Sequence, residues 1–275
     1  MLSLRPMAAR GSSRTSRISP LMSKPEISVC ANLEELSRAA AELFVEAAAT
    51  RISVTGGFHA ALSGGTTPRR LYELLGTSAY SDRISWPDVH LFQVDERCVP
   101  PDHPDSNFKM IREALLARVP VPRTTFHRLA AEQLDLEESS RQYATELERV
   151  VQLRAGGFPR LDVVFLGMGP DGHTASLFPG SPALEEENLW VRPNFVEKVG
   201  THRITLTFPV LNAAVRIIFL VSGGEKAETL RRVLEGPLVP EQLPAQGIKS
   251  VDGRVIWYVD GAAARLLASA SRSTG

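Results

Sequence analysis

Mostly apolar segments that run directly into glycine-rich loops recur along this chain, and they restrict its possible folds more than any other feature. Such segments occupy residues 58–62, 161–166 and 216–221, and each has too few polar residues to alternate between a core and solvent. Short apolar runs of this kind are typical of strands buried on both faces of a parallel sheet. Two glycines follow each run within three residues, so each predicted strand ends in a loop that can approach a ligand closely.

Helical segments separate the predicted strands. Asn32 and Glu35 have the spacing of a capping box before apolar residues at helical intervals, and Pro68 suits the first turn of another helix. Further helices are expected near residues 106–117, 136–153, 225–234 and 262–268, and further strands near residues 89–94, 126–129, 203–208 and 255–259. This alternation predicts an α/β fold, with a mainly parallel sheet and helices on both faces, in a single domain over residues 26–275.

Composition argues against two kinds of partner. No apolar run approaches the roughly 18 residues that a membrane span needs, so we expect no membrane partner. Residues 26–275 carry 26 basic and 31 acidic side chains, and nucleic-acid partners usually require a basic surface. A small anionic ligand would therefore have to be bound by local donors.

Residues 1–25 are predicted to be a separate extension. They contain five basic and no acidic residues and many serines, a composition shared by organellar transit peptides and by disordered tails. Met22 could equally be the true start of the chain. The two cysteines, Cys30 and Cys98, are too few and too distant for a metal site or a disulfide framework, and they fit a reducing compartment. We expect a cytoplasmic protein, or an organellar one if residues 1–25 are a transit peptide.

The first glycine loop, at residues 63–68, could bind an anion. It joins a predicted strand to a predicted helix, so hydroxyl groups, backbone amides and the positive helix end would meet there. A tight turn with a capping hydroxyl is the alternative. A similar loop at residues 222–226 ends in Lys226, which could add a point charge or simply be a solvated lysine.

Two polar clusters follow the strand predicted at residues 89–94. Asp95, Glu96 and Arg97 could orient sugar hydroxyls or form a salt-bridged loop. Ser106 and Asn107 could contact a ligand, but they are equally suited to cap the next helix.

The loop after the strand at residues 161–166 carries an Asp-Gly-His sequence. A carboxylate beside an imidazole can select its tautomer and raise its basicity, which favours His173 as a general base supported by Asp171. No paired His or Cys spacing indicates a metal, and no Gly-x-Ser-x-Gly elbow indicates a serine nucleophile. A structural histidine is the alternative.

These linked motifs resemble the family formed by 6-phosphogluconolactonases and glucosamine-6-phosphate deaminases, over residues 27–268. Their most specific parts lie at residues 63–68, 95–97, 105–107, 167–180, 203–207 and 222–226. The resemblance implies a Rossmann-like fold, no cofactor, and hydrolysis of 6-phosphogluconolactone in the pentose phosphate pathway. It also implies that His173 is the general base on water.

The resemblance also separates the two branches of that family. In the deaminases, the fifth residue after the equivalent histidine is a glutamate that assists ring opening, whereas this chain has Phe178. A sugar-phosphate deaminase or isomerase and a non-catalytic sugar-phosphate sensor remain the alternatives. We expect a sugar phosphate lactone as the ligand, and a monomer or weak homodimer.

The predicted site has two parts. The catalytic residues are His173 and Asp171. The residues expected to bind the substrate or its phosphate, with Arg203 beside Lys226 at the phosphate, are Ser63, Gly64, Gly65, Thr66, Thr67, Asp95, Arg97, Asn107, Gly169, Arg203 and Lys226.

Overall fold

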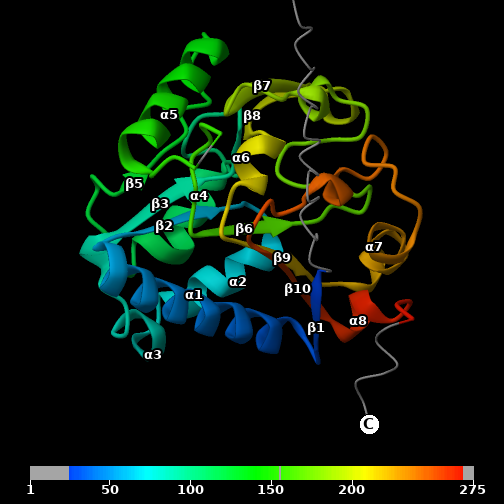
Figure 1. Ribbon diagram of the computed structural model, residues 1–275, viewed down its shortest axis with the longest axis horizontal. Helices are drawn as coiled ribbons and strands as arrows, with labels where there is room; N and C mark the ends of the chain where they lie inside the picture. The colour runs from blue at the N-terminus through cyan, green and yellow to red at the C-terminus, as the bar shows by residue number, and fades with distance from the viewer. Residues whose placement is uncertain (1–24, 155, 269–275) are drawn as a thin grey trace, which may run out of the picture.

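A seven-stranded parallel sheet forms the centre of the protein in a computed structural model (Figure 1). The structure describes residues 25–154 and 156–268. In spatial order, the strands are β1 (Glu26–Cys30), β10 (Arg254–Asp260), β9 (Arg216–Val221), β6 (Val163–Gly167), β2 (Phe58–Leu62), β3 (Val89–Gln93) and β5 (Phe126–His127). Every pair of neighbours in this sheet is parallel. The mainly parallel sheet predicted from the glycine-terminated strands is confirmed.

Helices cover both faces of the sheet, as expected (Figure 1). One layer contains α1 (Leu33–Thr55), α2 (Thr66–Leu75), α3 (Ser78–Ser81) and α4 (Asn107–Ile111), which continues as a π-helical turn over Arg112–Leu116. The opposite layer contains α5 (Leu136–Val150), α6 (Phe208–Asn212), α7 (Ala227–Glu235) and α8 (Gly261–Ala264). Short 3₁₀ turns lie at Trp86–Asp88, Pro182–Glu185, Glu197–Val199, Gly224–Lys226 and Pro244–Gly247.

The two layers share the strands because side chains alternate between the faces. In β6, Val163 and Phe165 pack toward the α1 and α2 layer, whereas Val164 and Leu166 pack toward the opposite layer. All four side chains have no exposed surface. Burial on both faces explains why the strand has no polar alternation in the sequence.

Helix α1 begins as its capping box predicts. The Asn32 Oδ1 accepts a hydrogen bond from the Glu35 amide at 3.0 Å, and the Glu35 carboxylate accepts one from the Ala31 amide at the same distance. Gly56 ends the helix with a positive φ of 78°, a conformation that costs glycine little. Within the described part of the chain, no helix combines the length and apolar character needed to cross a membrane.

A second, antiparallel sheet extends the fold beyond β3. It contains β4 (Asp95–Arg97), β8 (Thr201–Leu206) and β7 (Val191–Val196), in that order. The strand expected at residues 203–208 therefore lies outside the parallel sheet. The sequence did not indicate β7, because Pro193 interrupts its apolar pattern and Phe195 is 46% exposed. Strand β1 was also not predicted; all five of its residues are exposed or half-buried on the sheet edge, and it lacks a buried apolar run.

The predicted division of the chain is only partly covered by the structure. Of the expected extension at residues 1–25, all but Pro25 lie outside the described residues. The assignment of residues 26–275 to one domain stays a prediction.

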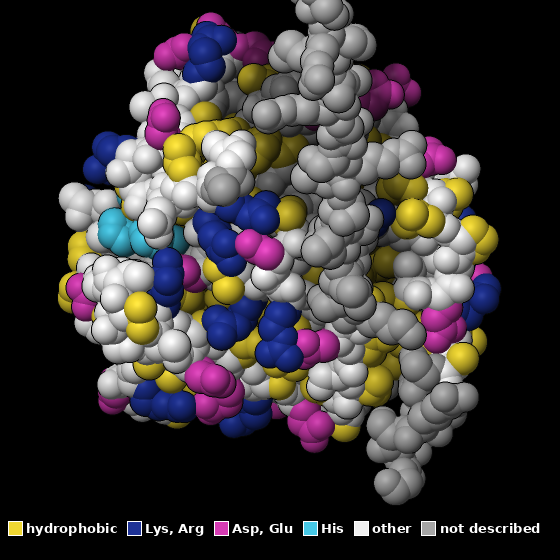
Figure 2. Space-filling view, in the orientation of Figure 1, with side chains coloured by type: hydrophobic (Ala, Val, Ile, Leu, Met, Phe, Trp, Pro, Cys, Tyr) yellow, Lys and Arg dark blue, Asp and Glu magenta, His cyan; other side chains and the backbone are white. Residues whose placement is uncertain are grey.

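Three histidines stack side by side on β2, β3 and β5. Figure 2 shows histidine side chains at the edge of the molecule where these strands lie in Figure 1. The ring of His90 lies 5.2 Å from that of His59 on one side and 5.2 Å from that of His127 on the other. Burial, and after it the neighbouring histidines, lower the pKa of His90 to about 4.

This lowered pKa makes the stability of the protein depend on pH. In the unfolded chain His90 binds a proton near pH 6.5, whereas in the folded protein it binds one only near pH 4. The stability that this difference provides is complete above pH 6.5 and is lost as the pH falls toward 4. We therefore expect the free energy of unfolding, measured with urea between pH 7 and 4, to decrease more steeply in the wild type than in His90→Gln. Parallel profiles for the two proteins would assign the acid sensitivity to other groups.

Candidate active site

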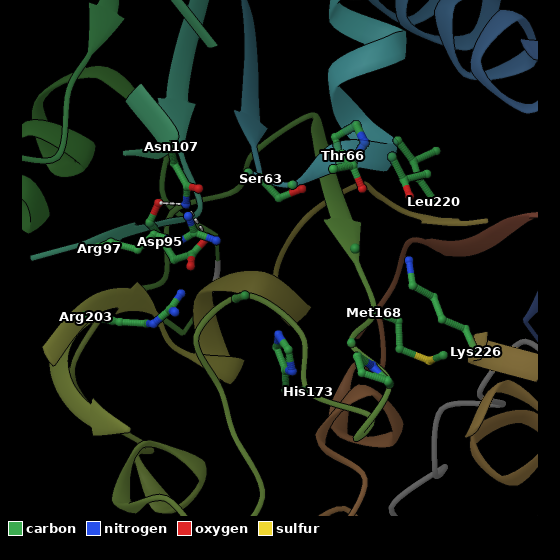
Figure 3. A pocket seen from close by; sticks show the side chains of 18 residues that line it. Ser63, Thr66, Asp95, Arg97, Asn107, Met168, His173, Arg203, Leu220 and Lys226 are labelled. Atoms are coloured by element: carbon green, nitrogen blue, oxygen red, sulfur yellow. Dashed lines mark hydrogen bonds between the residues drawn. The ribbon is translucent and has the colours of Figure 1, made fainter. Parts of the chain in front are cut away.

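Four adjacent strands of the parallel sheet end at the same place, and the loop after each contributes to one pocket (Figure 3). In spatial order these are β9, β6, β2 and β3. Ligands in open α/β sheets bind beyond the carboxyl ends of such strands. The pocket collects all the predicted site residues except Asp171, namely Ser63, Gly64, Gly65, Thr66, Thr67, Asp95, Arg97, Asn107, Gly169, His173, Arg203 and Lys226.

The loop after β6 presents the imidazole of His173 with its carboxylate partner. The Nδ1 of His173 lies 2.5 Å from the Oδ1 of Asp171. Burial alone would raise the pKa of the Asp171 carboxyl, but hydrogen bonds from His173 and Lys198 hold it well below its usual range. Because an ionised carboxylate only accepts hydrogen bonds, the proton of the neutral imidazole lies on Nδ1, and in that tautomer Nε2 has a free lone pair. This is the arrangement of a general base.

The same loop is tied to its surroundings at several points. The Gly169 amide donates to the His173 carbonyl at 2.9 Å, and Thr174 Oγ1 donates to the carbonyl of Gly167 at 2.8 Å. Thr229 Oγ1 on α7 donates to the Pro170 carbonyl at 2.6 Å. A Cβ on Gly169 would overlap the imidazole of His173, so this glycine provides the space that the ring occupies.

Phe178 lies against the other side of the base. Its ring stacks on His173 with the centroids 4.0 Å apart and an angle of 18° between the planes. The guanidinium of Arg203 lies 5.5 Å from the centroid of the same ring, within the range of a cation–π contact. The phenylalanine that cannot transfer protons therefore orients the histidine and an arginine.

Two arginines face each other at the next part of the pocket. Arg97 on β4 and Arg203 on β8 are paired residues in the antiparallel register, and the Nε of each is buried without a hydrogen-bond partner among the described residues. Burial lowers the pKa of the Arg203 guanidinium. Like charges opposite each other destabilise a sheet, and buried N–H groups without acceptors add to this cost. An anion between them would relieve both penalties.

Acidic residues after β3 hold this part of the pocket together. Asp95 accepts hydrogen bonds from the side-chain amide of Asn107 at 3.3 Å and from Ser176 Oγ at 2.6 Å. Glu96 is buried, does not line the pocket, and accepts hydrogen bonds from the backbone amides of Asn107 and Phe108, each at 2.7 Å. Glu96 therefore caps α4 instead of orienting a sugar hydroxyl, the role that its sequence position left open. Ser106 also caps this helix, through the Lys109 amide, as the capping interpretation predicted.

The loop after β2 has the geometry that the predicted anion cradle at residues 63–68 requires. Its chain enters α2 through Gly65, whose φ of 105° favours glycine, and a Cβ on Gly64 would overlap the side chain of Asn107. The hydroxyl of Ser63 is buried and has no hydrogen-bond partner among the described residues. Thr66 and Thr67 form the first turn of α2, where backbone amides are free to receive an anion.

The loop after β9 contributes only its lysine. Ser222 Oγ and the Gly223 amide both donate to the carboxylate of Asp260, so this loop is not a second cradle. Lys226 reaches the pocket, and burial lowers the pKa of its ammonium group. His173 lies between Lys226 on one side and Arg203 with Arg97 on the other (Figure 3).

Several residues at the site were not predicted. Met168 and Leu220 line the pocket as apolar wall, and Ser176 supports Asp95 from the buried side. Lys198 lies in the turn between β7 and β8, and its Nζ is 2.7 Å from the Oδ2 of Asp171. No local pattern marks Lys198, because it reaches the site only through the pairing of β7 with β8. Within the described residues, no three His, Cys, Asp or Glu side chains form a group that could hold a metal ion.

Comparison with known proteins identifies relatives over most of the chain. The model of a family described as glucosamine-6-phosphate isomerases/6-phosphogluconolactonase matches residues 31–257. The 6-phosphogluconolactonase of Synechocystis sp. is 37% identical over 86% of this chain and 95% of its own. A probable chloroplastic 6-phosphogluconolactonase of Oryza sativa is 36% identical over 86% of this chain and 73% of its own. The solved structure of 6-phosphogluconolactonase from Trypanosoma brucei is 29% identical, with a TM-score of 0.79 and coverage of 89% of this chain and 99% of that one.

Proposed function

The chain belongs to the glucosamine-6-phosphate isomerase/6-phosphogluconolactonase family, and we propose that it hydrolyses 6-phospho-D-glucono-1,5-lactone to 6-phospho-D-gluconate in the pentose phosphate pathway. The observation that carries the proposal is the Asp171–His173 pair, which lies in a pocket with cationic groups on both sides. The similar lactonases of Synechocystis sp. and Oryza sativa support it. We further propose a cytoplasmic monomer or weak homodimer, with an organelle as the alternative location.

The two cationic parts of the pocket suggest how the substrate lies. The phosphate would bind the loop at residues 63–67 together with Lys226, where hydroxyls and the amides of the first turn of α2 supply donors. The lactone carbonyl would then lie near His173 and the pair of Arg97 and Arg203. The pairing of Arg203 with Arg97 leads us to place it at the carbonyl and not beside Lys226. Binding through the phosphate fixes the orientation of the reacting carbon.

In the proposed reaction, His173 first accepts a proton from water and later donates it to the leaving oxygen of the lactone ring. His173 Nε2 takes a proton from a water molecule as the water oxygen bonds to the lactone carbonyl carbon. The carbonyl oxygen becomes negatively charged, and Arg97 and Arg203 stabilise it. The bond between the carbonyl carbon and the ring oxygen then breaks, and the imidazolium returns the proton to the ring oxygen, which becomes a hydroxyl group.

Phe178 argues against the alternative amino-sugar reaction. Its ring occupies the position beside His173 where ring opening of an amino sugar would use a proton-transferring side chain. A sensor without catalysis is the other alternative, but the ionised Asp171 beside a correctly oriented imidazole would serve no purpose there.

A direct assay tests the proposed function. Freshly prepared 6-phosphogluconolactone should be hydrolysed far faster than by buffer alone, as measured by acid release in a pH-stat, and glucosamine 6-phosphate should release no ammonia. Glucono-1,5-lactone, which lacks the phosphate, should be a much poorer substrate because it cannot use Lys226. Equal rates on the two lactones would contradict a phosphate-anchored mechanism.

Lys226→Met supplies the matched variant for this assay. Methionine keeps the length of the side chain but removes its charge, so the KM for the phosphorylated lactone should rise about 10-fold or more, as expected for a lost charge-assisted hydrogen bond. The rate on the unphosphorylated lactone should not change. An unchanged KM for the phosphorylated lactone would remove Lys226 from the phosphate site.

A further inference from the structure

The turn between β7 and β8 reaches the catalytic loop from a distant part of the chain. Lys198 lies in this turn, 27 residues after Asp171, and its Nζ lies 2.7 Å from the Oδ2 of that carboxylate. The other oxygen of the carboxylate, Oδ1, is the partner of His173. Lys198, Asp171 and His173 therefore form a continuous chain of hydrogen bonds that ends at the base.

The two partners of this ion pair differ in their exposure to solvent. The Lys198 side chain is 62% exposed, whereas the Asp171 side chain is only 20% exposed. Among the described residues, Asp171 is the only ion-pair partner of this lysine. One oxygen of a mostly buried carboxylate thus has a cationic partner at the surface, and the other oxygen has the imidazole as its partner.

The same hairpin holds the base from a second direction. Arg203, five residues further along the hairpin, lies against the Phe178 ring that stacks on His173. The two contacts come from one hairpin and reach two different neighbours of the imidazole, Asp171 and Phe178. A rigid connection of this kind restricts both the position and the rotation of a catalytic side chain.

We propose that Lys198 is a positioning residue for the catalytic base, acting through Asp171 to fix the orientation of His173 and to limit its proton affinity. The inference rests on the proposed function, in which His173 is the base. Lys198 is absent from the lining of the pocket that contains His173 and lines a neighbouring hollow with Asp171, so we expect no contact with the substrate.

The direction of the electrostatic effect follows from the charges around His173. The charged groups that face it from its own loop, the hairpin and the neighbouring loops are Asp171, Lys198, Arg203, Asp95, Arg97 and Lys226. Lys198 is positive and disfavours the imidazolium, whereas Asp171 favours it. Removing the lysine charge leaves the negative charge of Asp171 without its cationic partner. The carboxylate then stabilises the imidazolium more strongly, so the pKa of His173 should rise.

The test compares Lys198→Met with the wild type and with Lys198→Arg. Nitrogen NMR of the labelled imidazole should show the pKa of His173 rising by about half a pH unit in Lys198→Met, as expected for an exposed ion pair, and staying near the wild-type value in Lys198→Arg. Below that pKa, kcat/KM for 6-phosphogluconolactone should fall by about threefold, because less of the base is neutral. The KM should change little, since Lys198 does not contact the substrate.

Two controls make the outcome decisive. Lys249→Met removes a lysine that has no ion pair with a described residue, and an equal shift in this variant would reduce the effect to general surface charge and overturn the proposal. In an Asp171→Asn background, Lys198→Met should produce a clearly smaller shift, because only the direct repulsion between the lysine and the imidazolium remains, and a shift of undiminished size there would show that the lysine does not act through Asp171. An unchanged His173 pKa in folded Lys198→Met would also overturn the proposal. Because the NMR titration needs no substrate, it distinguishes this failure from failure of the proposed function, which would appear as a wild type without lactonase activity.

Discussion

His173→Asn should keep the fold and substrate binding of the wild type and lose about two to four orders of magnitude in kcat, the usual contribution of a positioned general base. Asparagine has a polar side chain of similar reach, but it has no lone pair that can accept a proton from water at neutral pH. The measurement is the initial rate of 6-phosphogluconolactone hydrolysis in a pH-stat at saturating substrate. Circular dichroism and thermal unfolding should report an intact protein, because the His173 side chain is 26% exposed and contributes little to the core.

A binding measurement separates this loss from a loss of affinity. Calorimetric titration with 6-phosphogluconate, the proposed product, should give a similar Kd for His173→Asn and the wild type, since the phosphate contacts are unchanged. His202→Asn is the matched control, because His202 lies on β8, is exposed, and packs against Phe195 outside the pocket. Turnover by His173→Asn close to that of the wild type would refute the general-base role.

Gly169→Ala should lose about 100-fold in kcat, although it adds one methyl group and removes no functional side chain, because a displacement of a catalytic group by about 1 Å is enough for such a loss. A Cβ at this position would overlap the imidazole of His173. Gly169 does not have a positive φ, so alanine can adopt its backbone conformation and the effect is one of space. The base would have to rotate away from Asp171 and Phe178, both of which now hold it in place.

The control for Gly169→Ala is the same substitution at Gly57. This glycine lies before the first residue of β2, at the opposite end of the strand from the pocket, and a Cβ there would meet His59 and Asp88 at ordinary distances of 3.7 and 3.9 Å. Gly57→Ala should therefore retain the wild-type rate. The hydrogen bond between Asp171 and His173 can be followed in the variants by the proton NMR signal of Nδ1–H. If Gly169→Ala kept that signal and full activity, the glycine would not be the residue that makes room for the base.

The two variants probe different requirements of one mechanism. His173→Asn removes the chemical group, whereas Gly169→Ala leaves the group in place and disturbs its geometry. Similar losses of kcat would mean that orientation matters as much as basicity at this site. That result would agree with a base held by contacts on three sides: Asp171 at one edge, Phe178 on one face and Gly169 against the ring.

Local sequence predicted the elements that depend on neighbouring residues. The capping box at Asn32 and Glu35, the helix that begins near Pro68, and the buried strands at residues 58–62 and 216–221 all occur where expected. These features depend on hydrogen bonds and side-chain spacing within a few residues, so they are visible without the rest of the fold. Strand β7 was missed because its stability comes from pairing with β8 and not from its own apolar pattern.

The candidate site also divides into features that the local sequence predicted and features that it did not. Glycine loops after apolar strands predicted which segments would gather at the carboxyl edge, and Asp171 with His173 could be paired because only one residue separates them. The role of Glu96 as a helix cap could not be separated from a ligand contact, since both uses favour an acid at that position. The same ambiguity applied to Ser106, which caps α4.

By itself, the sequence of this protein predicted most of the strands and helices in their order, the loops that carry the polar residues, and a candidate base with its carboxylate partner. These depend on short-range chemistry that any fold with this chain order must respect. Only the tertiary structure decided that Arg97 faces Arg203, that Phe178 stacks on His173, and that Lys198 contacts Asp171. Such contacts depend on strand pairing and on the approach of distant segments, and the free energy that selects them comes from burial in the whole molecule.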